Sequence, residues 1–258
     1  TIRSLKQMSS RRLLNELQLR RGAGQHSFVY STLKVFPTEG VAGEILQQVR
    51  EMIDEFDAEL SRREQALKAF DGLLAKVELE ADRQKIGVVR EELGSHLNLS
   101  TLNRMAAFVQ MAGDEAMTPQ ERLALAISGW LVGADQATVN LPVALSMYDV
   151  RGLVREYLTT PDALKRSQIL ADIRAQEAGT TAYVARLVRW MLPLAELPPE
   201  SQKKTGYYEL SVTGPDGTPI SYWVQVPPEY DPLRRYPLIV TLNGAGTSPQ
   251  LQIDWWAG

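Results

Sequence analysis

The chain has 258 residues, of which 44% are apolar, and a formal net charge of −3. This length and apolar content suffice for one large domain or two modest ones, and the lack of a basic excess argues against a nucleic-acid partner, which needs clustered Lys and Arg. Cysteine is absent and only two histidines are present, which excludes disulfides, a cysteine nucleophile and thiolate metal sites and argues against a multi-histidine site, so no metal is expected.

Membrane spanning is not expected, because the longest apolar run, around residues 123–132, is shorter than the roughly 20 residues that a transmembrane helix needs. We therefore expect a soluble protein. The polar, basic start at Thr1 contains no signal or transit peptide, so the compartment stays open. The missing initiator Met and the abrupt end at Gly258 lead us to expect a piece of a longer protein, shortened at both ends.

Apolar residues recur every three or four positions from residue 4 to about residue 197, which is typical of α-helices. Glu59 and Arg63 interrupt the clearest stripe, so we predict a long helix that could break near Ser61 and that packs into a bundle, not a sustained coiled coil. No repeat of fixed period is present, which favours a non-repeating bundle over a solenoid. The stripe consists of Ile45, Val49, Met52, Phe56, Ala66, Phe70, Leu73 and Val77.

Two later helices have recognisable start signals. The run Thr118-Pro-Gln-Glu121 combines an N-cap hydroxyl, a proline at the first helical position and an acid at the third, which is a capping box. The run Thr160-Pro-Asp162 repeats the proline start with an acid in the first turn. Amphipathic patterns predict further helices over residues 141–158, with a proline in the first turn, and over residues 181–192.

The pattern changes after residue 197. A polar, proline-bearing stretch at residues 198–206 predicts a linker. Residues 207–212 and 220–226 then read as a hairpin around the Asp-Gly turn at residues 214–217, with a loop longer than two residues because of its flanking prolines. Residues 238–242 are apolar apart from Thr241, which suits a third strand covered on both faces. We predict an α+β chain: an α-helical domain over residues 1–197, a linker over 198–206 and a second domain over 207–258.

The hairpin, a Pro-Glu-Tyr-Asp-Pro lead and the run Tyr-Pro-Leu-Ile-Val-Thr-Leu-Asn-Gly-Ala-Gly at residues 236–246 resemble the opening of an α/β-hydrolase domain. The run is most similar to prolyl-oligopeptidase-like peptidases and polyhydroxybutyrate-depolymerase-like esterases. The helical region also resembles, in texture only, the amino-terminal extension of some bacterial members. The resemblance implies that residues 207–258 begin the catalytic domain of a serine hydrolase, a peptidase or carboxylic-ester hydrolase. Such an enzyme forms an acyl-enzyme from a peptide or ester substrate and needs no metal or organic cofactor.

In that family the turn after the third strand helps to build the oxyanion hole. Backbone N–H groups reach an oxyanion only where the chain turns sharply without bulky side chains, and glycine allows this. The resemblance therefore makes Ala245 or Gly246 the expected donor, with Gly244 and Asn243 supporting the turn. The family usually has histidine where this chain has Asn243, but the asparagine could still hold the loop through side-chain hydrogen bonds.

The chain contains no Gly-x-Ser-x-Gly nucleophile motif. The run Gly246-Thr-Ser248-Pro-Gln250 begins this motif but ends in Gln and follows the wrong strand, so Ser248 is expected to be a loop or helix-cap serine. His26 and His96 precede the hydrolase-like part, whereas the acid and histidine of this fold follow the nucleophile, so both are expected to be structural or to face solvent. We expect the triad to lie beyond Gly258 and the chain alone to be inactive.

Several other interpretations stay open. The helical domain could bind a protein partner and act as an interaction or scaffold module attached to a hydrolase-like domain that has lost activity. Trp255 and Trp256 could line a substrate pocket or cover the sheet edge. Gly244-Ala-Gly246 could begin a dinucleotide fingerprint, although Pro249 occupies its third glycine position. The Arg20-Arg21 pair could bind an anion, and the acids at residues 54–59 could suggest a metal site, although their spacing favours a solvated helix face.

Overall fold

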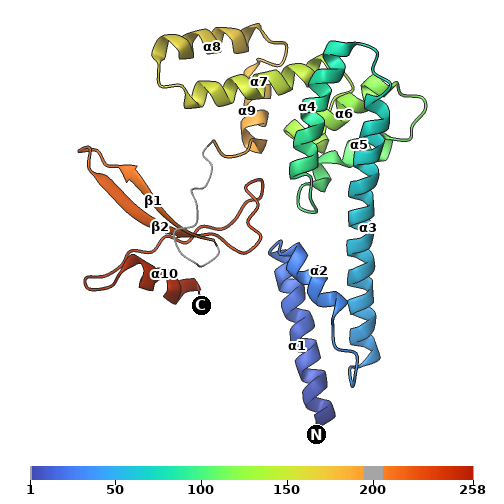
Figure 1. Cartoon of the computed structure of the whole chain (residues 1–258), viewed down its shortest axis with the longest axis vertical. Helices are drawn as coiled ribbons and strands as arrows, with labels where there is room; N and C mark the ends of the chain where they lie inside the picture. Colours follow the sequence, from blue (N-terminus) through green and yellow to red (C-terminus); the bar gives the residue numbers. More distant parts are fainter. Residues whose placement is uncertain (1, 195–205, 258) are drawn as a thin grey trace. The chain divides into compact units, whose positions relative to one another are not determined.

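The structure is a computed structural model that describes residues 2–194 and 206–257 (Figure 1). Contacts between residues divide the chain into two compact units, Thr1–Leu194 and Ala195–Gly258, called unit 1 and unit 2 below. The predicted linker at 198–206 lies outside the described residues except for Gly206. The described residues are mostly helical with one small antiparallel sheet, which is compatible with the α+β class.

Unit 1 is entirely helical within its described residues. Its α-helices are α1 (Ile2–Gly22), α2 (His26–Lys34), α3 (Gly43–Leu74), α4 (Glu80–His96), α5 (Ala106–Met111), α6 (Pro119–Val132), α7 (Leu141–Thr159), α8 (Ala163–Ala175) and α9 (Thr181–Trp190). Two short 3₁₀-helices, η1 (Leu102–Met105) and η2 (Ala134–Gln136), flank α5 and α6.

Helix α3 is continuous, so the break considered near Ser61 does not occur. The two charged residues that interrupt its apolar stripe find polar partners on other segments: Glu59 pairs with Arg21 of α1 at 3.6 Å, and the Arg63 Nε donates to the Leu97 carbonyl at 2.6 Å. Because Glu59 and Arg63 both have polar partners, the apolar stripe can be interrupted at these residues while the helix stays continuous.

The long α3 joins two parts of unit 1. Helices α1 and α2 pack against its first half, and α4, α5 and α6 contact it further along (Figure 1). The first part has its own core around Phe56, which is fully buried between α1, α2 and α3. The other core residues there are Leu14, Leu17, Val29, Leu33, Phe36, Ile45, Val49 and Met52.

Helix α6 is the centre of the second part. All ten residues from 123 to 132 are buried, and the helix contacts α3, α4, α5, α7 and α9. A helix that is apolar on every side is stable only when neighbours cover every side. Gly129 permits a close contact of α6 with η1, because a Cβ there would lie 2.7 Å from the Arg104 carbonyl oxygen.

The capping chemistry predicted for α6 is confirmed. The Glu121 amide donates to the Thr118 hydroxyl at 3.2 Å, and the Thr118 amide donates to the Glu121 carboxylate at 2.7 Å. The proline start predicted for α8 is wrong: Asp162 is the N-cap, accepting from the Lys165 amide at 2.9 Å, and the helix begins at Ala163. Asp is a strong N-cap residue, and here it caps the helix after Thr160 and Pro161.

Unit 2 contains an antiparallel hairpin of β1 (Tyr207–Thr213) and β2 (Pro219–Gln225), followed later by α10 (Pro249–Ala257). The five residues from 214 to 218 connect the strands, so the prediction of a long hairpin loop is confirmed. Gly217 has φ +84°, a conformation that suits glycine. Tyr207 and Trp223 pack together with ring centroids 5.4 Å apart, as expected for cross-strand packing.

The third strand predicted at residues 238–242 does not form among the described residues: this segment belongs to no helix or strand, and the sheet has two strands. Its apolar side chains are exposed, with Leu238 at 85% and Leu242 at 89%. A parallel strand exists only by hydrogen bonding to neighbouring strands. No such neighbour pairs with this segment in the described part of unit 2, so an apolar sequence alone does not make it a strand.

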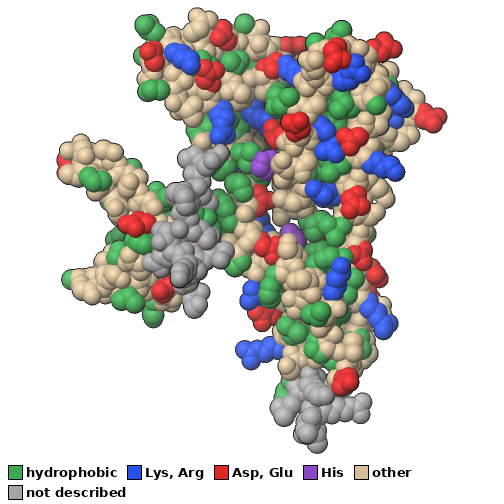
Figure 2. All heavy atoms as spheres, in the orientation of Figure 1, with side chains coloured by type: hydrophobic (Ala, Val, Ile, Leu, Met, Phe, Trp, Pro, Cys, Tyr) green, Lys and Arg blue, Asp and Glu red, His purple; other side chains and the backbone are tan. Residues whose placement is uncertain are grey.

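Acidic and basic side chains alternate over the face of unit 1 seen in Figure 2, without a field of one sign. None of the described helices combines the length and the apolar character needed to cross a membrane.

Candidate functional site

The predicted oxyanion-hole residues form a tight turn in unit 2. The Thr247 amide donates to the Gly244 carbonyl at 3.1 Å, which closes a four-residue β-turn. Gly246, its third residue, has φ +82°, whereas Ala245 is not among the residues with positive φ. This combination identifies a type II turn, in which the third position is normally glycine. We expected glycine to permit this turn, and the reason is the positive φ of Gly246, a conformation that side chains disfavour.

The Asn243 side chain spans the same turn from the preceding residue. Its Nδ2 donates to the Thr247 carbonyl oxygen at 2.8 Å. Asn243, Gly244, Ala245 and Gly246 are all exposed, and within the described residues no hydrogen bond uses the N–H group of Ala245 or Gly246. Two adjacent N–H donors are thereby open to a ligand, on a turn closed by two hydrogen bonds.

The helix that follows the turn is anchored at its start. Ser248 accepts a hydrogen bond from the Leu251 amide at 3.2 Å, so its predicted role as a helix-cap serine is confirmed. The buried Tyr207 of β1 donates its hydroxyl to the Gln250 carbonyl at 3.2 Å. The turn is therefore followed by a capped helix that is attached to the hairpin.

Trp255 and Trp256 lie on α10 and pack edge to face, with ring centroids 5.1 Å apart. They are 75% and 55% exposed, so neither indole is buried against the hairpin. Helix α10 contacts β2 of the hairpin, so both roles considered, covering the sheet edge and lining a substrate pocket, stay predictions.

The two histidines lie on helices of unit 1. The His26 Nε2 is 3.2 Å from the Ser100 hydroxyl, and the His26 ring packs edge-on against Phe56 at 6.0 Å. These contacts join α2 to α3 and to the segment after α4, which agrees with the structural role expected for His26. His96 lies in the last turn of α4.

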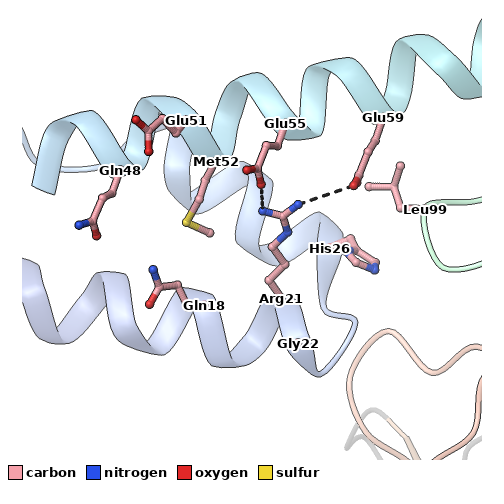
Figure 3. A pocket seen from close by; sticks show the side chains of 10 residues that line it. All are labelled: Gln18, Arg21, Gly22, His26, Gln48, Glu51, Met52, Glu55, Glu59 and Leu99. Carbon is pink, nitrogen blue, oxygen red and sulfur yellow. Dashed lines mark hydrogen bonds and ion pairs between the residues drawn. The ribbon is translucent and has the colours of Figure 1, made fainter.

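Unit 1 has an open cleft of about 590 Å³ between α1 and α3, with α2 and Leu99 also contributing (Figure 3). Its α3 side carries Glu51, Glu55 and Glu59, one helical turn apart, and its α1 side carries Gln18 and Arg21. The remaining lining residues are Gly22, His26, Gln48, Met52 and Leu99. No sequence pattern pointed to this cleft, because it joins residues that lie far apart in the sequence, such as Arg21 and Glu55, which are 34 positions apart.

Arg21 bridges the cleft. Its guanidinium pairs with Glu55 and, at 3.6 Å, with Glu59 (Figure 3), and lies 4.8 Å from the centre of the Phe56 ring. Arg20 pairs with Glu16 at 2.8 Å and donates to Gln25. Both arginines are thus committed to neighbours in unit 1, so the anion-binding role considered for this pair finds no support.

The acidic side chains at residues 54–59 of α3 bond to more than one partner. Besides the two glutamates that pair with Arg21, Asp57 accepts a hydrogen bond from the Tyr30 hydroxyl. Among the described residues, no group of three or more His, Asp or Glu side chains is arranged to hold a metal ion. This distribution matches a solvated helix face better than the metal site that was considered.

A polar cluster that the sequence did not reveal joins α4, α6 and α7. Glu92 accepts from Arg151 at 2.6 Å and from the Trp130 indole at 2.8 Å. Burial raises the pKa of Glu92, but the hydrogen bonds and charge of Arg151, together with Trp130, lower it more, so the pKa lies below its ordinary value. Each ion-pair side chain is 18% exposed, so solvent screens the pair only in part. The cluster ties three helices together.

Comparison with protein-family models, curated proteins and solved structures finds no match to this chain. The resemblance of residues 207–258 to α/β-hydrolases therefore rests on the quoted sequence run alone.

Proposed function

We propose that this chain is the amino-terminal part of a serine hydrolase, a peptidase or carboxylic-ester hydrolase that works through an acyl-enzyme, and that its turn at residues 244–247 supplies an oxyanion-hole donor. The observation that carries the proposal is the type II turn itself, with Ala245 and Gly246 exposed and their N–H groups open. The apolar run before it and the resemblance described above support the same assignment.

In the proposed mechanism the catalytic residues and the oxyanion-hole donor come from two different parts of a longer protein. The nucleophilic serine, its histidine and the acid come from residues that follow Gly258. The turn contributes backbone N–H groups that stabilise the negative charge on the substrate carbonyl oxygen when the serine attacks. Such a donor contributes roughly 3–4 kcal/mol to lowering the barrier. In this proposal the exposed side chains of Trp255 and Trp256 form an aromatic surface that contacts the substrate.

The test is covalent labelling with a fluorophosphonate, which reacts with activated serines. We expect the longer protein to be labelled at one serine in a Gly-x-Ser-x-Gly sequence, and residues 1–258 alone to remain unlabelled. Failure of the longer protein to react would overturn the assignment. Labelling of residues 1–258 would overturn the location of the nucleophile, and a Ser100→Ala variant would then show whether the serine beside His26 is responsible.

A second candidate function is an interaction module, in which the helical unit binds a protein partner beside a hydrolase-like domain without activity. The open cleft formed within unit 1 favours it, as does Asn243 in place of the family's usual histidine. The sequence beyond Gly258 discriminates between the two candidates: a nucleophile motif followed by an acid and a histidine supports the enzyme, and a motif lacking its serine supports the module.

A further inference from the structure

We infer that Asn243 is the positioning residue of this site: its side-chain amide holds the turn at residues 244–247 in the conformation that presents the N–H groups of Ala245 and Gly246. The inference rests on the proposed function and assigns to Asn243 the task of preorganising the oxyanion hole. It concerns a side chain that acts through the backbone and does not itself touch the substrate.

The first argument is the way in which two hydrogen bonds close the same loop. Thr247 donates through its amide to Gly244 at 3.1 Å and accepts through its carbonyl from Asn243 Nδ2 at 2.8 Å. Both the N–H and the C=O of Thr247 are thus fixed to residues on the other side of the turn. Rotation of the Gly244–Ala245 peptide, which carries the Ala245 N–H, would break the bond to the Gly244 carbonyl. The orientation of the Ala245–Gly246 peptide, which carries the Gly246 N–H, is set by the positive φ of Gly246.

The second argument is the open space around the two glycines of the turn. A Cβ atom placed on Gly244 or Gly246 would have no heavy atom within 4 Å, so no side chain packs against either position in the described part of unit 2. Exposed glycine-rich backbone has high conformational entropy, about 1–2 kcal/mol per residue to be fixed. Since no side chain packs at these two positions, the local hydrogen bonds have a large part in deciding whether the donors keep one geometry.

The third argument is the chemistry of the residue. An oxyanion hole works because its donors already point at the position of the developing charge, without reorganisation during the reaction. An asparagine amide donates to a carbonyl without titrating, so the clamp is the same at every pH at which the protein is folded. The departure from the family's usual histidine thus need not abolish the site, since the amide reaches across the turn directly.

The experiment compares Asn243→Ala with Ser211→Ala as the control. The control truncates an exposed polar side chain of β1 in the same unit, outside the turn, and leaves both hydrogen bonds of Thr247 in place. In the longer protein, with p-nitrophenyl acetate as substrate, we expect Asn243→Ala to lower kcat by about 10- to 100-fold, less than the loss of a whole donor. KM should change by less than about twofold, since ground-state binding is untouched. Ser211→Ala should change both constants by less than about twofold.

A second readout does not require activity. Amide hydrogen exchange on residues 1–258 should show the Thr247 N–H exchanging at least about tenfold faster in Asn243→Ala than in the control, because the turn opens more often. If the longer protein hydrolyses nothing and resists the fluorophosphonate, the proposed function fails, while exchange still tests the clamp. If the longer protein is active and Asn243→Ala keeps its kcat, or if Thr247 exchange is unchanged, the inference on Asn243 is wrong.

Discussion

Two apolar runs of this chain are similar in sequence and opposite in environment. Residues 123–132 of unit 1 form the core of α6 and are buried without exception. Residues 238–242 of unit 2 are just as apolar, but form no strand and carry side chains such as Leu238 and Leu242 that are almost fully exposed. Composition sets the tendency to be buried, and the presence of packing partners decides whether burial occurs.

The difference lies in what each element needs. A helix satisfies its backbone hydrogen bonds internally, so α6 needs only apolar neighbours, and five surrounding helices supply them. A strand leaves its N–H and C=O groups for adjacent strands. Unit 2 has one hairpin, and neither of its strands pairs with residues 238–242 in the described part of the chain. The same contrast should appear when matched residues of the two units are changed.

The largest expected contrast is between Ile127→Ala and Ile239→Ala. Ile127 is fully buried in α6, so its truncation leaves a cavity and should lower the free energy of unfolding by about 2–5 kcal/mol. Ile239 is 71% exposed, so the same truncation should change it by less than about 0.5 kcal/mol. Urea unfolding followed by helical circular dichroism measures both. Similar losses for the two variants would mean that residues 238–242 are buried in solution.

The second contrast concerns two carboxylates whose pKa lies below its ordinary value. Arg151 and Trp130 outweigh burial at Glu92, and hydrogen bonds from Thr218 act on the exposed Asp216. A lowered folded-state pKa stabilises the fold above the unfolded value, about 4.3 for Glu, and this stability is lost as pH falls through the folded pKa.

Glu92→Gln should therefore lower the free energy of unfolding by about 1.5–3 kcal/mol at pH 7 and flatten its decline below about pH 4.3. Asp216→Asn should leave the stability of the helical unit unchanged over the same range, because its carboxylate is exposed in the hairpin loop of unit 2. Unfolding curves measured from pH 3 to pH 7 test both expectations. An unaltered pH profile in Glu92→Gln would show that the Arg151 pair does not couple folding to this titration.

The smallest contrast is between two glycines that are required for different reasons. Gly129→Ala brings a Cβ within 2.7 Å of the Arg104 carbonyl, and the overpacking should cost about 1–3 kcal/mol. Gly246→Ala meets open space but must adopt φ +82°, at a local cost of about 1–2 kcal/mol. Helical circular dichroism should therefore detect the first substitution and not the second. Gly72→Ala, on an exposed and open face of α3, is the control and should stabilise that helix by about 0.5–1 kcal/mol.

The sequence by itself determined the elements whose signals are local. The capping box at Thr118 and Glu121, the apolar stripe of α3 and the hairpin around Gly217 each depend on residues a few positions apart, and the structure has all three. The same holds for the cap at Ser248 and for the glycine turn, because a turn depends on the φ that its own residues allow. Asn243 could be suspected of holding this turn for the same reason, since its acceptor is four residues away.

Only the tertiary structure decided what depends on distant partners. The continuity of α3 past Glu59 and Arg63 required Arg21 and the Leu97 carbonyl, and the cleft between α1 and α3 required their side-by-side packing. Glu92 pairs with Arg151, which is 59 positions further along the chain. Sequence periodicity relates only residues that are close in the chain, so it could not predict this pair. Residues 238–242 show the converse case: their β-propensity is local, but a strand also needs a neighbouring strand, and no local pattern can supply one.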